Sequence, residues 1–213
     1  MSSTKRSGDV MRGERLLEVL AMLLLGIATV GSAWCGYQAS KWNGEQADLA
    51  RAASDARVES TRLFTLSVQS MSYDATFVAN YAQAYQAKNT DLMKFYRTAL
   101  VRPAFLPVLD EWEAEAKAGR PPANLLTNQD YIDTMYAPYY ESVATSEELS
   151  LAAEEAGSYS DAFVLTTLLF AVALFFAGVT SSFRFRGVRI VLLMGAVLVI
   201  AFAAARLVDL PVQ

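Results

Sequence analysis

Three long apolar runs divide this sequence. Residues 19–37 contain no charged side chain, and two further apolar runs, residues 162–182 and 188–205, follow near the end. A helix needs about 20 apolar residues to cross the hydrocarbon core of a bilayer. The pattern therefore predicts an all-α membrane protein with three transmembrane helices, at residues 16–37, 161–182 and 190–206.

Between the first two runs lies a polar, alanine-rich segment, residues 38–160. Apolar residues recur in it mostly three or four positions apart, which is typical of one face of an amphipathic helix. These residues are Leu49, Ala52, Ala56, Leu63, Leu66, Phe77, Tyr81 and Ala84. We expect the segment to form an extracytoplasmic antiparallel helical bundle between the first and second transmembrane helices.

Turn signals divide the same segment. Residues 88–91, Lys-Asn-Thr-Asp, predict a turn whose Asn or Thr caps a short helix that stops before Pro103. A further helix is expected from about residue 104 to 118, ended by Gly119. Residues 127–130 open the return helix, which we expect to be interrupted or kinked near Pro138.

Positive charge predicts the orientation, because short loops rich in Lys and Arg stay on the cytoplasmic side. Residues 1–15 and the turn at 183–189 are both basic, through Arg12, Arg15, Arg184, Arg186 and Arg189. We therefore expect these two segments inside, with residues 38–160 and 207–213 outside. The basic start resembles a signal peptide, and we expect it to be retained as a signal anchor. Glu18 is expected at the inner boundary, snorkelled or paired with an arginine.

A stripe of small residues follows the first transmembrane helix as it leaves the membrane. Ser32, Gly36, Ser40 and Gly44 are spaced four apart and so share one side of a helix. Small residues at this spacing let two helix backbones approach closely. The stripe is expected either to dock the second and third spans of the same chain or to pack copies of the protein together.

Aromatic and polar residues gather where the first span leaves the bilayer and where the second begins, as in an interfacial belt. The expected junction consists of Trp34, Tyr37, Gln38, Trp42, Glu45, Gln46, Tyr159 and Asp161. We expect the side chains of five of these residues to hydrogen-bond the start of the second span, around Tyr159 and Asp161, and so to fix the joint between the bundle and the membrane. They are Tyr37, Gln38, Trp42, Glu45 and Gln46.

The run Trp-x-x-Tyr-Gln-Ala-x-x-Trp-x-Gly-Glu-Gln-Ala, residues 34–47, and the apolar residues 164–170 and 174–178 resemble segments of an uncharacterised family of bacterial membrane proteins of unknown function. The resemblance covers the two membrane junctions. It implies a bacterial inner membrane and carries no activity.

Candidate chemistry is sparse. The chain has no histidine and one cysteine, Cys35, which removes the commonest general base and metal ligand. Glu147, Glu148, Glu154 and Glu155 share a helix face, and acids flank Trp112; we interpret both groups as solvated faces. We interpret a group of four tyrosines as part of the core and rim of the bundle rather than as a binding site for a ligand or partner. They are Tyr131, Tyr136, Tyr139 and Tyr140. We predict no catalytic, cofactor or metal residues, and no enzyme.

Three function classes follow. The first is a non-catalytic oligomeric inner-membrane protein, a scaffold or accessory subunit of an envelope complex. The second is a periplasmic ligand sensor acting through a separate partner. The third is a subunit of an oligomeric channel or transporter. Expected partners are the lipid bilayer, further copies of the chain and other membrane or periplasmic proteins. The net charge of −4 argues against nucleic acid.

Overall fold

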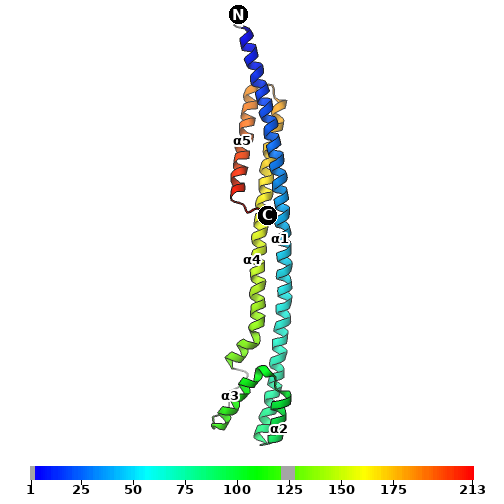
Figure 1. The fold of residues 1–213 in the computed structure, drawn as a ribbon, viewed down its shortest axis with the longest axis vertical. Coiled ribbons are helices and arrows are strands. Elements are labelled where there is room, and N and C mark those ends of the chain that lie inside the picture. Colours follow the sequence, from blue (N-terminus) through cyan, green and yellow to red (C-terminus); the bar gives the residue numbers. More distant parts are fainter. Residues whose placement is uncertain (1–2, 121–127) are drawn as a thin grey trace. The chain divides into compact units, whose positions relative to one another are not determined.

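The computed structural model describes residues 3–120 and 128–213, with side chains from Glu14 onward. Every regular element in these residues is helical, as predicted (Figure 1). In chain order the elements are α1 (Ser3–Gln86), α2 (Thr90–Phe95), the π-helical turn η1 (Tyr96–Leu100), η2 (Pro103–Phe105), α3 (Leu106–Lys117), α4 (Gln129–Val179), η4 (Thr180–Ser182) and α5 (Arg186–Val208).

Three helices in the described part of the chain are long and apolar enough to cross a membrane. They are α1, the end of α4 together with η4, and α5, so each contains one of the three apolar runs. The sequence-based expectation of three candidate spans is confirmed.

The chain divides into two compact units. Unit 1 comprises Met1–Ala50 and Ser150–Gln213, and unit 2 comprises Arg51–Leu149. Helices α1 and α4 contribute residues to both units, α5 belongs to unit 1, and α2 and α3 belong to unit 2.

In unit 1, α1 packs against α4. The Ser160 hydroxyl donates a hydrogen bond to the Ala39 carbonyl at 3.0 Å, and Gly31 lies against the ring of Phe170. These pairs show that α1 and α4 are antiparallel, because the residue number rises on one helix as it falls on the other. The core is made of Ala28, Cys35, Ala39, Phe163, Phe170, Ala173 and Ala203.

In unit 2, α1 and α4 are again antiparallel. The hydroxyls of Ser146 and Ser142 donate to the carbonyls of Ala53 and Ala56, at 3.1 and 2.9 Å. The buried line of α1 repeats every seven residues, which is typical of a coiled-coil seam; its members are Ala53, Ser60, Ser67, Asp74 and Tyr81. Helix α3 adds to this unit a core containing Phe77, Phe105, Leu109, Trp112 and Tyr131.

This seam corrects one sequence-based expectation. Leu66 was expected on the buried face but is 44% exposed, whereas its neighbour Ser67 is buried. The Ser67 hydroxyl donates to the Met135 carbonyl at 2.6 Å, which satisfies it inside the seam. Polar residues thus occupy buried positions of the seven-residue repeat, and a search for apolar residues does not identify those positions.

The predicted turns are largely confirmed. Asn89 caps α2, its side chain accepting a hydrogen bond from the Leu92 amide at 3.0 Å. The following turns end at Leu100, before Pro103, and Gly119 follows α3 with a φ of 72°. Thr127 of the predicted return lies outside the described residues.

The return helix is not interrupted at Pro138, so of the two expected outcomes, an interruption or a kink, only a kink is compatible with the structure. Helix α4 is assigned as one element from Gln129 to Val179 with Pro138 inside it. Figure 1 shows α4 bending within its first turns, as expected for a helix that loses one amide donor.

Candidate functional site

The small-residue stripe lies on a face of α1 that the rest of the chain leaves open. A Cβ atom added to Gly36 or Gly44 would meet nothing within 4 Å, and Ser40 is exposed. Only Ser32 is partly buried. Docking of the second and third spans on this stripe is therefore wrong. The intramolecular contact instead uses the face bearing Ala28, Gly31, Cys35 and Ala39, where phenylalanine rings of α4 pack.

Gln38 is the most deeply buried polar residue of the predicted junction, with no exposed surface. Its side-chain amide donates to the Gln213 carbonyl at 3.0 Å, and its amide oxygen accepts from the Gln213 backbone N–H at 3.1 Å. The Trp42 indole N–H donates to the Pro211 carbonyl at 3.0 Å. These three hydrogen bonds hold Pro211 and Gln213, in the segment that follows α5, against α1.

The expected partner of Gln38 is thus corrected, since its partner follows α5 rather than starting the second span. Trp42 and Gln46 do contact α4: the rings of Trp42 and Tyr159 lie 4.8 Å apart, and the Gln46 amide lies against Gly157. Tyr159 donates to Glu155 at 2.6 Å. The remaining members of the predicted junction are exposed: Trp34, Tyr37, Glu45 and Asp161.

The basic turn and α1 are joined by an ion pair. Arg189 lies 3.6 Å from the Glu18 carboxylate, and its Nε donates to the Thr180 carbonyl at 3.2 Å. The pairing predicted for Glu18 with an arginine is confirmed. Arg15, Arg184 and Arg186 are exposed. The Arg12 side chain lies outside the described side chains.

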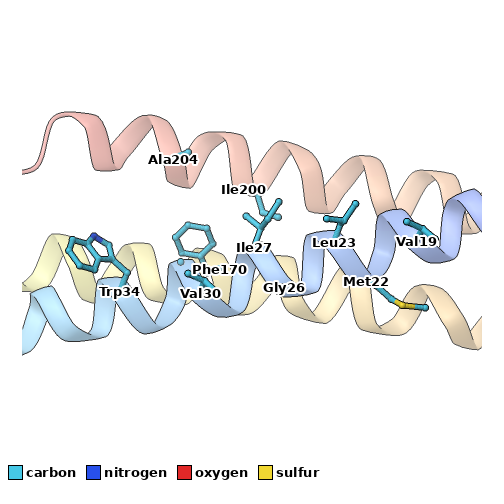
Figure 2. A pocket seen from close by; sticks show the side chains of 11 residues that line it. Val19, Met22, Leu23, Gly26, Ile27, Val30, Trp34, Phe170, Ile200 and Ala204 are labelled. Atoms are coloured by element: carbon cyan, nitrogen blue, oxygen red, sulfur yellow. The ribbon is translucent and has the colours of Figure 1, made fainter.

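An open apolar groove of about 850 Å³ follows α1 in unit 1. Figure 2 shows it between Val19 at one end and Trp34 at the other, with α5 alongside. Phe170 of α4 and Ile200 and Ala204 of α5 complete the lining. Gly26 is one of the lining residues of α1, and a Cβ atom added there would meet nothing within 4 Å. The groove can accept a slender apolar group.

Unit 2 contains a buried polar cluster that sequence reasoning missed. Asp74 is 1% exposed and accepts hydrogen bonds from Arg102 at 3.1 Å and from the Tyr131 hydroxyl at 2.5 Å. Burial, followed by the hydrogen bond to Asp74, raises the pKa of Tyr131. The only available signal was the seven-residue spacing that places Asp74 on the seam.

A second polar cluster joins α1 to α3. The Tyr81 hydroxyl donates to Glu113, which also pairs with Arg97 at 3.1 Å, and Arg97 donates to Asp110. Burial, followed by the hydrogen bond to Glu113, raises the pKa of Tyr81. The interpretation of these α3 acids as a solvated face is wrong for Glu113, whose side chain is only 16% exposed.

The other acidic and aromatic groups match their interpretation as surface and rim. Glu147, Glu148, Glu154 and Glu155 are exposed. At the rim, Tyr136 and Tyr139 contact Phe64, and Tyr140 contacts both of these tyrosines, whereas Tyr131 belongs to the core. Within residues 14–120 and 128–213, no three His, Cys, Asp or Glu side chains lie together as metal ligands would.

Comparison with protein-family models, with characterised proteins and with solved structures found no match for this chain. The resemblance at residues 34–47 therefore stays an expectation, and function is argued from the chain itself.

Proposed function

We propose that this chain is a non-catalytic inner-membrane protein of bacterial cells that works as an oligomer, as a scaffold or accessory subunit of an envelope complex. The N-terminus and the basic turn face the cytoplasm, and unit 2 projects outside. Three long apolar helices support membrane insertion. The basic residues at one end of unit 1 support the orientation, because Lys and Arg near short loops stay inside.

The observation that carries the oligomer is the open stripe on α1. Gly36, Ser40 and Gly44 form a smooth face against which no other part of the described chain packs. Gly36 lies at the end of the expected first span and Ser40 and Gly44 follow directly. Inside a bilayer, burial of apolar surface gives helices little drive to associate, so at Gly36 close backbone contact through small residues is a main source of affinity. A second α1 helix, from another copy, is the partner that this face fits.

The assembly mass in mild detergent tests this proposal. The native chain is expected to run as an oligomer, and the Gly36→Leu/Ser40→Leu variant as a monomer, because two leucines prevent close contact of the backbones. Gly178→Leu is the matched control, since Gly178 is also exposed in a candidate span with open space around its Cβ position. It should keep the native mass.

Two results would refute the proposal. A native chain that is monomeric in several mild detergents and in lipid nanodiscs removes the oligomer. A double variant that keeps both the native mass and the native unfolding temperature shows that the stripe is no interface.

A further inference from the structure

We propose that unit 1 binds one anionic glycerophospholipid, with an acyl chain in the α1–α5 groove and the phosphate between Arg15 and Arg186. This inference rests on the proposed function in placing unit 1 in a membrane with its basic end on the cytoplasmic side. It does not require an oligomer.

The direction of the helices brings the two arginines to one level. Glu18 of α1 pairs with Arg189 of α5, and farther along Trp42 of α1 bonds to Pro211 beyond α5, so the two helices are parallel. Arg15 and Arg186 each precede a member of the Glu18–Arg189 pair by three residues. Each therefore lies about one turn, roughly 4.5 Å, beyond the pair and on the same helix face.

These arginines carry charge that the ion pair does not neutralise. Glu18 is engaged by Arg189, whereas Arg15 and Arg186 are exposed and have no ion-pair partner among the described side chains. Arg184 adds a third exposed cation nearby in sequence. Clusters of arginine at the cytoplasmic end of transmembrane helices attract anionic lipid headgroups, and each arginine contributes about 1 kcal/mol to this attraction.

The groove begins where this basic cluster ends. Val19, its first lining residue on α1, directly follows Glu18, and the last, Trp34, lies 15 positions farther on. At 1.5 Å per residue the groove is about 22 Å long. One leaflet supplies about 15 Å of hydrocarbon, so a chain that starts at the arginines is accommodated over its whole length. The lining residues are almost entirely apolar, as an acyl chain requires (Figure 2).

Native mass spectrometry of the full-length chain tests the site, with phosphatidylglycerol and phosphatidylcholine of identical acyl chains as probes. One phosphatidylglycerol per chain should be retained in preference to phosphatidylcholine. Arg15→Gln/Arg186→Gln should weaken phosphatidylglycerol binding about 25-fold, at about fivefold per arginine, and abolish the preference. Arg206→Gln, which removes an exposed arginine at the other end of α5, should change neither.

A second pair of variants tests the groove. Gly26→Leu fills it from α1 and should reduce retention of both lipids, whereas Gly178→Leu, equally exposed but outside the groove, should not. Equal retention of the two lipids by the native chain would overturn the proposal. So would a Gly26→Leu variant that loses its oligomeric mass but keeps its lipid, because the groove would then hold a second copy. A monomer that retains phosphatidylglycerol refutes the oligomer alone.

Discussion

At the residue scale, Asp74 has the largest predicted effect on stability. Asp74→Ala leaves Arg102 and the Tyr131 hydroxyl without their buried acceptor. We expect a loss of about 2–4 kcal/mol in the free energy of unfolding. Chemical unfolding of the detergent-solubilised chain, followed by circular dichroism, measures it. Glu59→Gln is the control, because the Glu59–Arg62 pair is exposed and should contribute nothing measurable. Equal stability of both variants would contradict the role of Asp74.

The two buried tyrosines predict a dependence on alkaline pH. The pKa of Tyr81 and of Tyr131 is raised from about 10 by burial and by a carboxylate acceptor. The folded state therefore holds these protons more tightly than the unfolded state. Their contribution is complete below about pH 10 and is lost as pH rises further. The unfolding temperature should fall above that pH, and the fall should be smaller in Tyr81→Phe/Tyr131→Phe. An identical pH profile for the variant would exclude these tyrosines as its cause.

Residue partners were the least predictable feature. Gln38 was identified as unusual from its position, but its partner Gln213 lies 175 residues away, and no local pattern connects them. Asp74 was missed because a search for apolar residues at helical spacing does not detect a polar residue, even one that is buried together with its hydrogen-bond donors. For Glu18, sequence predicted that the partner would be an arginine but not that it would be Arg189. A carboxylate at the membrane boundary close to basic residues is stabilised by pairing with one of them.

At the element scale, the fit between α1 and α4 depends on Gly31. A Cβ atom there would lie 2.6 Å from the Phe170 ring, which is 3% exposed and has little room to move. Gly31→Ala should lower the unfolding temperature, equivalent to about 1–3 kcal/mol of overpacking. Gly26→Ala is the matched control, because its Cβ position is open, and better helix propensity should leave it neutral or stabilised.

Replacement of Phe170 checks the cause. Phe170→Leu in the Gly31→Ala background should recover part of the lost stability, because the added methyl group then has space. If Gly31→Ala is as stable as Gly26→Ala, the close packing of α1 on α4 at this point is incorrect.

Element boundaries followed from sequence better than helix faces did. Asn89 and Gly119 were expected at element ends and lie at them, as the cap of α2 and as the residue of positive φ that follows α3. The small stripe identified a smooth face but not its neighbour, because Gly and Ser permit close approach without specifying what approaches. In this chain α4 uses the adjacent face, where Gly31 and Ala28 leave room for Phe170.

At the scale of the whole molecule, hydropathy predicted three candidate spans because about 20 apolar residues are a strong signal on their own. The boundary between the two compact units could not be predicted from the sequence, because it falls inside α1 and α4 and neither helix is interrupted there. Orientation depends on the distribution of arginine, and every function considered for this chain depends on that orientation.

Cysteine accessibility measures the orientation directly. In a Cys35→Ser background, cysteines replace Ala87 in the turn after α1 and Gly187 at the start of α5, both exposed positions. With a membrane-impermeant thiol reagent, Ala87→Cys should react in intact bacterial spheroplasts, whereas Gly187→Cys should react only after lysis. The opposite pattern, or equal reaction of both before lysis, would contradict a three-span protein with unit 2 outside.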